Sequence, residues 1–383
     1  MPAGGLNERR VLLPHTAVHD PPTKAHLEYA HTLDPGEWSR RHDRGQVPSR
    51  LPYGLDLLEE RGVHVTVSER SSARRGRLGR LGGRGGRALL KGVEPPLLRR
   101  ERELRRSSDL VVCWDERTGA TAAARSLLRG EPPTATGVIW ATEETRPARH
   151  LAPCLRSAGA VWALSCAQLD VLAAWGVPKA RLHHLLMGID ASFWQPPAEP
   201  AVEPGLVLAV GNDRHRDHAS VVEAVAEAAR RRPARLRLVT HHPVDVPPEL
   251  GERVPHCDHA ELRDHYARAA VVALALTPNL HLSGLTALLE SMACGKAVVV
   301  TRTPGIEHYV HAGLPVVHVV LDGETGVLVD PGPGPLAEAV GRLLDEPERA
   351  AELGARARRD ALARLTTAHQ ARALAEILQT ARR

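Results

Sequence analysis

The chain has 383 residues, of which 43% are hydrophobic, and this length suits two domains better than a single core. Its net charge of +5 is a mild excess, and no apolar stretch approaches the roughly 20 residues that a membrane-spanning helix needs. The five cysteines are scattered without a C-x-x-C pair, and the 21 histidines show no metal-binding spacing such as H-E-x-x-H. With a polar N-terminus unlike a signal peptide, we expect a cytoplasmic protein with neither a disulfide framework nor a metal site.

The N-terminal part of the chain predicts alternating strands and helices. Strands are expected at residues 10–13, 63–67, 109–114 and 137–140, and helices at 55–61, 118–128 and 167–175. Alternation of this kind is typical of an α/β domain, which we assign to residues 1–195. Thr142 and Glu143 follow the strand at 137–140. Because open α/β sheets bind ligands at the carboxyl ends of their strands, we expect both residues to face a cleft.

Residues 70–106 form an unusually basic tract. They contain 13 basic and three acidic residues, a local net charge of +10, so the rest of the chain carries a net charge of −5. Glycines through the middle of the tract disfavour a stable helix. The tract is expected to be either a solvated loop or a surface that attracts an anionic partner, such as a phosphate group or a membrane surface. It has no interleaved aromatic residues for base stacking, so nucleic acid is not the expected partner.

A second domain is expected after a Pro-rich linker at residues 196–204. It begins with a strand at 206–210, a polar turn from Gly211 to Asp217, and a helix at 219–232. A strand at 235–240 and a helix at 260–269 follow, and the chain after Pro347 is predicted to be helical. The repeated strand, turn and helix again favour a parallel α/β sheet.

The strongest functional pattern lies between residues 271 and 302. An apolar strand ends at Thr277, a polar loop runs to Ser283, and Gly284 opens a helix with apolar residues at helical spacing. The turn at Ser283 and Gly284 leaves backbone N–H groups free at a helix N-terminus, which favours an anion site. Glu290 lies inside this otherwise apolar run, where an ordinary surface acid is not expected.

The run SGLTALLESMACGKAVVVT at residues 283–301 resembles the donor-site motif of retaining GT-B glycosyltransferases of glycosyltransferase family 4. The resemblance implies two Rossmann-like domains that face each other across a cleft. It also implies that the backbone of Ser283, Gly284, Leu285 and Thr286 binds a nucleotide diphosphate, and that Glu290 binds the ribose. The family commonly has a second Glu eight residues earlier. Leu282 stands at that position here, and His281 is the nearest polar residue.

The turn after the strand at 206–210 resembles the family loop in which a basic residue reaches the diphosphate. Arg216 takes the place of the family's Lys, and Arg214 is the competing candidate. A fixed cation is needed there because negative charge grows on the diphosphate as the glycosidic bond breaks. The resemblance makes Arg216 and Glu290 the catalytic candidates. Further donor-binding candidates are Gly211, Asn212, His281, His256 and Cys257, the last two beside the nucleotide base.

The resemblance covers residues 205–345 well, and this is the expected donor-binding domain. Residues 346–383 are expected to form helices that cross back to the N-terminal domain, which would hold the acceptor. The acceptor-side candidates are His15, Tyr53, Thr142 and Glu143.

The implied activity is that of a retaining hexosyltransferase without a metal or cofactor. Its co-substrate would be a nucleotide-diphosphate sugar, and its acceptor a secondary metabolite or a cell-envelope glycan or lipid. For a lipid-linked acceptor, residues 70–106 would contact the inner face of the membrane. Two alternatives remain open. One is another GT-B activity, such as a sugar-nucleotide epimerase or a phosphorylase. The other is a non-catalytic protein that binds nucleotide sugars or polyanions.

Overall fold

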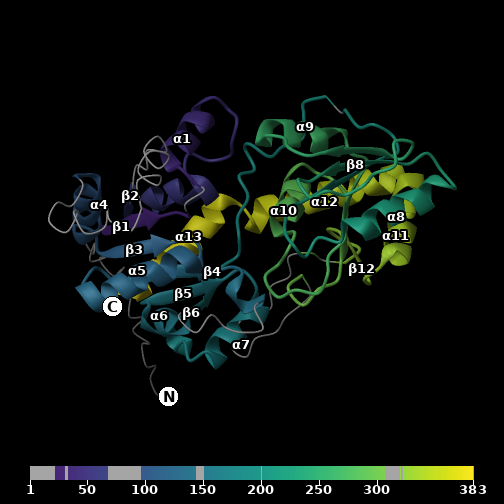
Figure 1. The fold of residues 1–383 in the computed structure, drawn as a ribbon. Coiled ribbons are helices and arrows are strands. Elements are labelled where there is room, and N and C mark those ends of the chain that lie inside the picture. The colour runs from purple at the N-terminus through teal and green to yellow at the C-terminus, as the bar shows by residue number, and fades with distance from the viewer. Residues whose placement is uncertain are drawn as a thin grey trace, which may run out of the picture.

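The computed structural model describes residues 22–30, 33–67, 96–143, 151–199, 201–306, 320 and 322–382. Within these residues the chain forms two parallel six-stranded sheets, each flanked by helices (Figure 1). The predicted α/β class, with two Rossmann-like domains, is confirmed. The strand expected at 10–13, His15 and the basic tract up to residue 95 lie outside the described residues.

The first sheet has the strand order β2-β1-β3-β4-β5-β6. Its strands are β1 (Thr23–Glu28), β2 (Val63–Val67), β3 (Leu110–Cys113), β4 (Thr134–Val138), β5 (Ala160–Ala163) and β6 (Leu182–His184). The three strands β3, β4 and β5 are buried along their whole length, because helices cover both faces of a parallel sheet. The sequence analysis placed no strand at β1.

The described helices of this domain include three 3-10 segments. They are α1 (Pro35–Asp43), η1 (Pro52–Arg61), α4 (Pro96–Arg106), α5 (Glu116–Arg129), η3 (Ala141–Glu143), α6 (Leu151–Ser157), α7 (Cys166–Ala174) and η4 (Lys179–Arg181), of which η1, η3 and η4 are the 3-10 segments. The helix expected at 55–61 is a 3-10 helix and not an α-helix. It forms the part of η1 that follows a kink, because Tyr53 and Gly54 adopt left-handed conformations with φ of 63° and 67° and interrupt the segment before Leu55.

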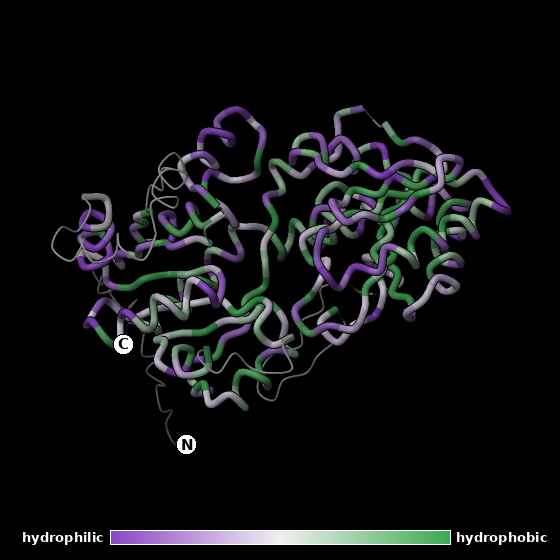
Figure 2. The backbone as a smooth tube through the Cα atoms, in the orientation of Figure 1, coloured by the Kyte–Doolittle hydropathy of each residue, from purple (hydrophilic) through white to green (hydrophobic). Residues whose placement is uncertain are grey.

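The second sheet has the order β12-β11-β10-β7-β8-β9. Its strands are β7 (Leu206–Val210), β8 (Arg235–Val239), β9 (Gly251–Val254), β10 (Val271–Leu274), β11 (Val298–Thr301) and β12 (Val327–Val329). Its helices are α8 (His218–Ala229), α9 (His259–Arg268), α10 (Leu285–Ala293) and α11 (Pro333–Asp345). Figure 2 shows hydrophobic strands inside each domain and hydrophilic segments on the outer helices and loops. With one Phe and four Tyr in the chain, Leu, Val and Ala supply most of this core.

The last two helices join the domains. Helix α12 (Pro347–Arg364) packs against α10, and α13 (Thr367–Arg382) returns to the first domain and packs against η1, β4 and β5 (Figure 1). The Gln370 side chain accepts a hydrogen bond from Gly188 N and donates one to the carbonyl oxygen of Tyr53, both at 2.8 Å. The backbone N–H of Thr367 donates to Ile189 O at 3.0 Å. These bonds fix the chain segment between the two sheets.

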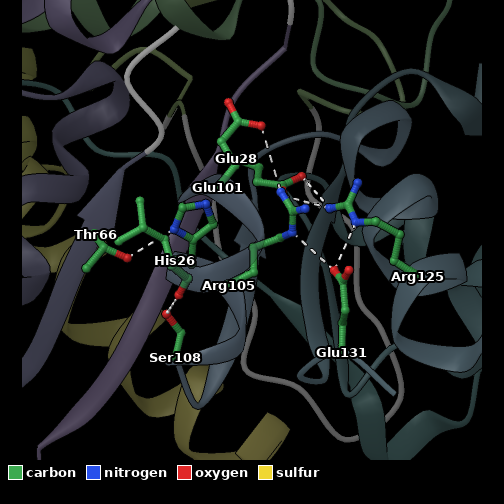
Figure 3. A network of polar contacts seen from close by, with 9 residues as sticks. His26, Glu28, Thr66, Glu101, Arg105, Ser108, Arg125 and Glu131 are labelled. Atoms are coloured by element: carbon green, nitrogen blue, oxygen red, sulfur yellow. Dashed lines mark hydrogen bonds and ion pairs between the residues drawn. The ribbon is translucent and has the colours of Figure 1, made fainter. Parts of the chain in front are cut away.

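A buried ionic network attaches α4 to the first sheet (Figure 3). Arg125 lies 2.6 Å from Glu28 and 3.2 Å from Glu131, and Arg105 lies 3.1 Å from Glu131 and 3.5 Å from Glu28. The two carboxylates are buried and the two guanidinium groups are mostly buried, so the charges balance away from water. Removing one member of such a pair leaves an uncompensated buried charge, which typically costs about 3–5 kcal/mol. Arg105, the last but one arginine of the basic tract, is therefore engaged inside the domain.

Among the described residues, no helix is both long and apolar enough to cross a lipid bilayer.

Candidate functional site

A cavity of about 310 Å³ lies where the carboxyl ends of the strands of the two sheets face each other. From the first domain its walls are Ile139, Trp140, Leu164 and Met187, and from the second they are Val210, Gly211, Asn212, Asp213, Arg216, Leu262, the stretch 281–287 and Glu290. Nine of the predicted donor-binding residues are thus brought together: Gly211, Asn212, Arg216, His281, Ser283, Gly284, Leu285, Thr286 and Glu290.

Arg216 is positioned by the loop between β7 and α8. Its guanidinium group lies between the backbones of Gly211 and Gly284, and a side chain at either glycine would collide with it. Its Nε and Nη1 atoms are buried and have no hydrogen-bond partner among the described residues. A buried donor without a partner is costly, and native structures rarely leave one unpaired. This arrangement is suited to an anion that enters the cavity.

Arg214 differs from Arg216 in each of these respects. Its side chain is exposed, does not line the cavity, and donates its Nε hydrogen to His215 Nε2 at 3.3 Å. Burial lowers the pKa of Arg216, and the charges of nearby Asp213 and Glu290 oppose that shift. An arginine remains protonated despite such a shift, so Arg216 is a fixed positive charge in the cavity.

The first turn of α10 supplies backbone donors. Gly284 begins the helix with φ of 91° and no side-chain cap, a conformation that favours glycine. Ser283 N already donates to Asn279 Oδ1, and Leu285 N donates to Leu282 O. The N–H groups at 284, 286 and 287 have no partner among the described residues. Ser283 N and Leu285 N thus have internal acceptors in this structure, and donation from either group to a diphosphate stays a prediction.

Leu282 turns its side chain into the core, and the neighbouring His281 lines the cavity. Leu282 has φ of 58°, a strained value for a residue other than glycine, and only 4% of its surface is exposed. His281 Nε2 lies 3.1 Å from Asp213 Oδ2, across 68 residues of sequence. A histidine and an aspartate thus occupy the region where the resemblance suggested a glutamate.

Asp213 is held as a carboxylate by its hydrogen bonds. Burial alone would raise its pKa, but bonds from His281, His215 N and Ser283 Oγ lower it below the ordinary range. The bond from Ser283 Oγ is 2.9 Å long and that from His215 N is 2.8 Å. Asp213 therefore orients His281 and Ser283 beside the cavity. Among the described residues, no group of three His, Cys, Asp or Glu side chains is arranged to hold a metal ion.

Glu290 is buried on the face of α10 that borders the cavity, with 5% of its surface exposed. Tyr266 Oη donates a hydrogen bond of 2.9 Å to its Oε2 atom. Burial raises the pKa of Glu290 to about 8, although the hydrogen bond from Tyr266 and the charge of Arg216 act in the opposite direction. The carboxyl group is thus placed where an incoming hydroxyl group can replace the hydration it lacks.

His256 and Cys257, the predicted base contacts, do not line this cavity. His256 is exposed, and Cys257 is half-buried and packs against the core. Burial together with the nearby acids Glu261 and Asp258 raises the pKa of the Cys257 thiol to about 11.

The predicted acceptor-side residues are only partly described. Tyr53 stacks on Trp114 with ring centroids 4.3 Å apart, and burial raises its pKa to about 12. Thr142 is buried and accepts a hydrogen bond of 2.8 Å from Gln168 Nε2. Glu143 ends η3, and its side chain, like His15, lies outside the described residues.

None of the four cavity residues of the first domain, Ile139, Trp140, Leu164 and Met187, was predicted as a site residue. The carboxylate of Glu116, at the start of α5, accepts hydrogen bonds from the backbone N–H groups of Ile139 and Trp140 at 2.8 and 3.0 Å. The sequence offered only a weak signal for this contact, a glutamate directly after the N-cap residue Asp115.

The comparisons with known proteins agree with this geometry. Residues 204–346, which include every predicted donor-binding residue, match the family model for group 1 glycosyl transferases. HepE from Anabaena in complex with UDP has a TM-score of 0.63 at 15% identity, covering 93% of this chain and 99% of that structure. Sucrose-phosphate synthase from Thermosynechococcus elongatus has a TM-score of 0.66 at 18% identity, covering 93% and 98%. The chain has the GT-B fold.

Two curated proteins are also similar. An alpha-maltose-1-phosphate synthase from Mycolicibacterium smegmatis is 27% identical over 304 residues, which cover 68% of this chain and 76% of the relative. An MMP alpha-(1->4)-mannosyltransferase from Mycolicibacterium hassiacum is 26% identical over 206 residues, covering 52% and 48%. Together with the family model, these relatives support a glycosyltransferase.

Proposed function

We propose that this chain is a retaining glycosyltransferase that moves a hexosyl group from a nucleotide-diphosphate sugar to an acceptor. The observation that carries the proposal is the buried guanidinium of Arg216, whose Nε and Nη1 atoms lack partners among the described residues. It adjoins the uncapped first turn of α10. A diphosphate between these groups would satisfy both the guanidinium and the helix N-terminus.

The donor would then extend along α10. The N–H groups at 284, 286 and 287 would bind the phosphate oxygens, and Glu290 would accept hydrogen bonds from the ribose hydroxyls. When the bond between the sugar C1 and the phosphate oxygen breaks, the electron pair stays on the diphosphate. Arg216 is placed to stabilise that added charge, an effect that is larger in the transition state than in the bound donor.

Retention is supported by the state of the carboxyl groups in the cavity. Asp213 is engaged by His281 and Ser283, and Glu290 by Tyr266, so neither is free to act as a base or nucleophile at the sugar. In the retaining mechanism that the family resemblance implies, the leaving phosphate accepts the proton of the attacking acceptor hydroxyl. The new bond then forms on the face from which the phosphate departs.

His281 would take over recognition of the donor sugar from the missing glutamate. Its ring lines the cavity beside Ser283 and is oriented by Asp213. A neutral imidazole that donates its Nε2 hydrogen to Asp213 has Nδ1 as an acceptor nitrogen, and a glutamate also accepts, so the preferred sugar would present a hydroxyl donor there.

For the acceptor we propose only a chemical class, namely a secondary metabolite or a cell-envelope glycan or lipid. It would bind on the first domain near Tyr53 and Thr142. His15 and Glu143 stay candidates on the same side. The names of the two curated relatives, both concerned with transfer or synthesis of hexose-containing products, favour a hexosyl donor. We also propose that the enzyme acts in the cytoplasm. For a lipid acceptor, residues 70–106 would contact the membrane surface.

The test begins with a thermal-shift panel of nucleoside diphosphates and their sugars, followed by transfer assays with the donor that stabilises the protein most. The expected product carries the same anomeric configuration as the donor, read from proton NMR coupling constants. An inverted product would refute retention. Donor binding without transfer to any acceptor, and without epimerised or phosphorylated sugar, would favour a non-catalytic binding protein.

A further inference from the structure

Glu290 lies in the wall between two cavities. One is the cavity at Arg216, and the other, of about 390 Å³, lies at the junction of the two domains. Glu290, Thr286 and Met187 line both. The walls of the second cavity also include Trp38, Tyr53, Asp190, Trp194 and His259. A glutamate side chain has several rotatable bonds, so its carboxyl group keeps a single direction only where a neighbouring group holds it.

Tyr266 on α9 holds one oxygen of this carboxyl group. Its Oη atom lies 2.9 Å from Glu290 Oε2 and 3.3 Å from Ala287 O. Ala287 O also accepts a hydrogen bond of 2.6 Å from Ser291 Oγ, so the nearer carboxyl oxygen is the better acceptor for the tyrosine hydroxyl. Burial raises the pKa of Tyr266 well above its ordinary value, so the hydroxyl keeps its hydrogen. Within the described part of the chain, the other carboxyl oxygen, Oε1, makes no hydrogen bond.

The ring of Tyr266 is held in one place by packing. It is buried, and Trp194 from the segment between the domains meets it edge to face, with ring centroids 5.9 Å apart and an interplanar angle of 87°. Just beyond Tyr266, Lys296 Nζ donates to Ala267 O at 2.7 Å and to Ala269 O at 3.1 Å, at the end of α9. The hydroxyl group of a ring fixed in this way keeps a defined direction.

We propose that Tyr266 is a positioning residue of the donor site, which holds Glu290 Oε2 so that Oε1 faces the ribose. This inference rests on the proposed function, which assigns the ribose to Glu290. Tyr266 lines neither cavity, so it acts only through Glu290. A hydroxyl group that donates to a carboxylate also favours the ionised form. Tyr266 therefore orients the carboxyl group and limits the rise of its pKa.

Other charged or titratable groups surround Glu290 from the elements packed against α10. Burial raises the pKa of Glu290 to about 8, and the hydrogen bond from Tyr266 and the charge of Arg216 act in the opposite direction. The remaining groups are Asp213 and His281 at the first cavity, Asp190 and His259 at the second, Cys257 before α9, Cys294 after α10, and Lys296, Arg263 and Arg358 around Cys294. Replacing Tyr266 leaves all of them in the chain, so a changed pH profile reports on the hydroxyl group.

The experiment is isothermal titration calorimetry of the full chain with UDP, ADP and GDP at several pH values, using the nucleotide that binds most tightly. Ribose hydroxyl groups bind the ionised carboxyl group better, so wild-type affinity should rise as the pH approaches about 8. Tyr266→Phe keeps the ring and removes only the hydroxyl group. Its rise should occur about one pH unit higher, which makes it bind about tenfold more weakly near pH 7. The ratio of the two affinities at each pH cancels the titration of the nucleotide itself.

Two controls accompany this measurement. Tyr29→Phe is the matched variant, because Tyr29 is buried, donates to Pro52 O at 3.4 Å and lines neither cavity. It should show the wild-type pH profile. Pyrophosphate, which has no ribose, should bind to the wild type and to Tyr266→Phe with equal affinity.

Unfolding of the unliganded protein gives a second measurement that needs no ligand. The folded-state pKa of Glu290 lies above its ordinary value, so stability falls as the pH rises up to that folded-state pKa. In Tyr266→Phe this fall should extend about one pH unit higher than in the wild type. Denaturant unfolding at a series of pH values also shows that the variant folds.

Two results would overturn the inference. The first is a pH profile of nucleotide affinity in Tyr266→Phe that matches the wild type. The second is an equal loss of affinity for pyrophosphate and nucleotide, which would indicate a general structural effect. If the proposed function fails, neither pyrophosphate nor any nucleotide binds the wild type, and the inference falls with it. Failure of the inference alone leaves wild-type binding intact, so the two failures are distinguishable.

Discussion

The two domains present different chemistry to the space between them. The second domain contributes charged and polar groups, namely Arg216, Asp213, His281 and Glu290. The first contributes apolar and aromatic groups, with Ile139 and Trp140 in one cavity and Trp38 in the other. Under the proposed function, this difference amounts to a division of tasks in which the second domain neutralises the donor's charge, while the first supplies shape and apolar contact.

The largest effect is expected at Arg216. Arg216→Ala should lower turnover by about 10²-fold or more, the typical loss when one preorganised electrostatic contact to developing charge is removed. Arg216→Lys should recover only part, because a point charge replaces a planar fork of donors. Steady-state kinetics with saturating acceptor measure both values.

Arg214→Ala is the matched control, two residues away on the same loop and exposed. It should stay near wild-type turnover. If Arg214→Ala lowers turnover and Arg216→Ala does not, the positive charge that stabilises the leaving diphosphate lies outside the cavity.

Glu290→Gln should weaken donor binding while keeping the fold. Above pH 8, where the carboxyl group of Glu290 is ionised, loss of one hydrogen bond to it typically costs about 1.5–3 kcal/mol, or roughly 10- to 150-fold in affinity. Calorimetry with the nucleotide checks this value. Unchanged affinity for the nucleotide would mean that the ribose does not contact Glu290.

The same residue predicts how stability varies with pH. The pKa of Glu290 is about 8 in the folded chain and near 4.5 as an ordinary value, so the folded state holds its proton over a range where the unfolded state has lost it. The unliganded wild type should therefore lose stability as pH rises from about 4.5 to 8. Denaturant unfolding of wild type and Glu290→Gln checks this, and the variant should show a flatter decline over that range. Parallel curves would mean that Glu290 is not held protonated.

The smallest effect on nucleotide binding is expected at Trp140. The residue is 36% exposed, its ring faces the guanidinium of Arg117 at 5.3 Å, and it lines the cavity from the first domain. Trp140→Ala should leave the dissociation constant for the nucleoside diphosphate within about twofold, since the lost contact is apolar and lies at an exposed residue. Its effect should appear in the KM for the acceptor. A tenfold loss of nucleotide affinity would end the division of tasks proposed above.

The cavity residues that were predicted from the sequence lie in two short, contiguous motifs. The turn 211–217 and the stretch 281–290 each sit at the end of one strand and the start of one helix, so local spacing is enough to place Arg216 and Glu290. The pairing of Asp213 with His281 spans 68 residues and depends on which strands lie side by side. Spacing along the chain carries no information of that kind.

The first domain was harder to predict for the same reason. Strand β1 carries His26 and Glu28, residues that strands usually avoid when buried, and Glu28 is accommodated by Arg105 and Arg125 from distant helices. The left-handed conformation of Tyr53 likewise goes with a distant contact, because the carbonyl oxygen of Tyr53 accepts a hydrogen bond from Gln370 on α13. His256 and Cys257, the predicted base contacts, directly precede the N-cap Asp258 of α9 and do not line the cavity at Arg216, and their role stays a prediction.

A crystal structure of the complex with UDP would locate the diphosphate and so test the role proposed for Arg216. We expect the diphosphate within hydrogen-bond distance of the Arg216 guanidinium and of the N–H groups at 284 and 286, with the ribose hydroxyls at Glu290. A diphosphate bound away from Arg216, for example at the exposed Arg214, would contradict it.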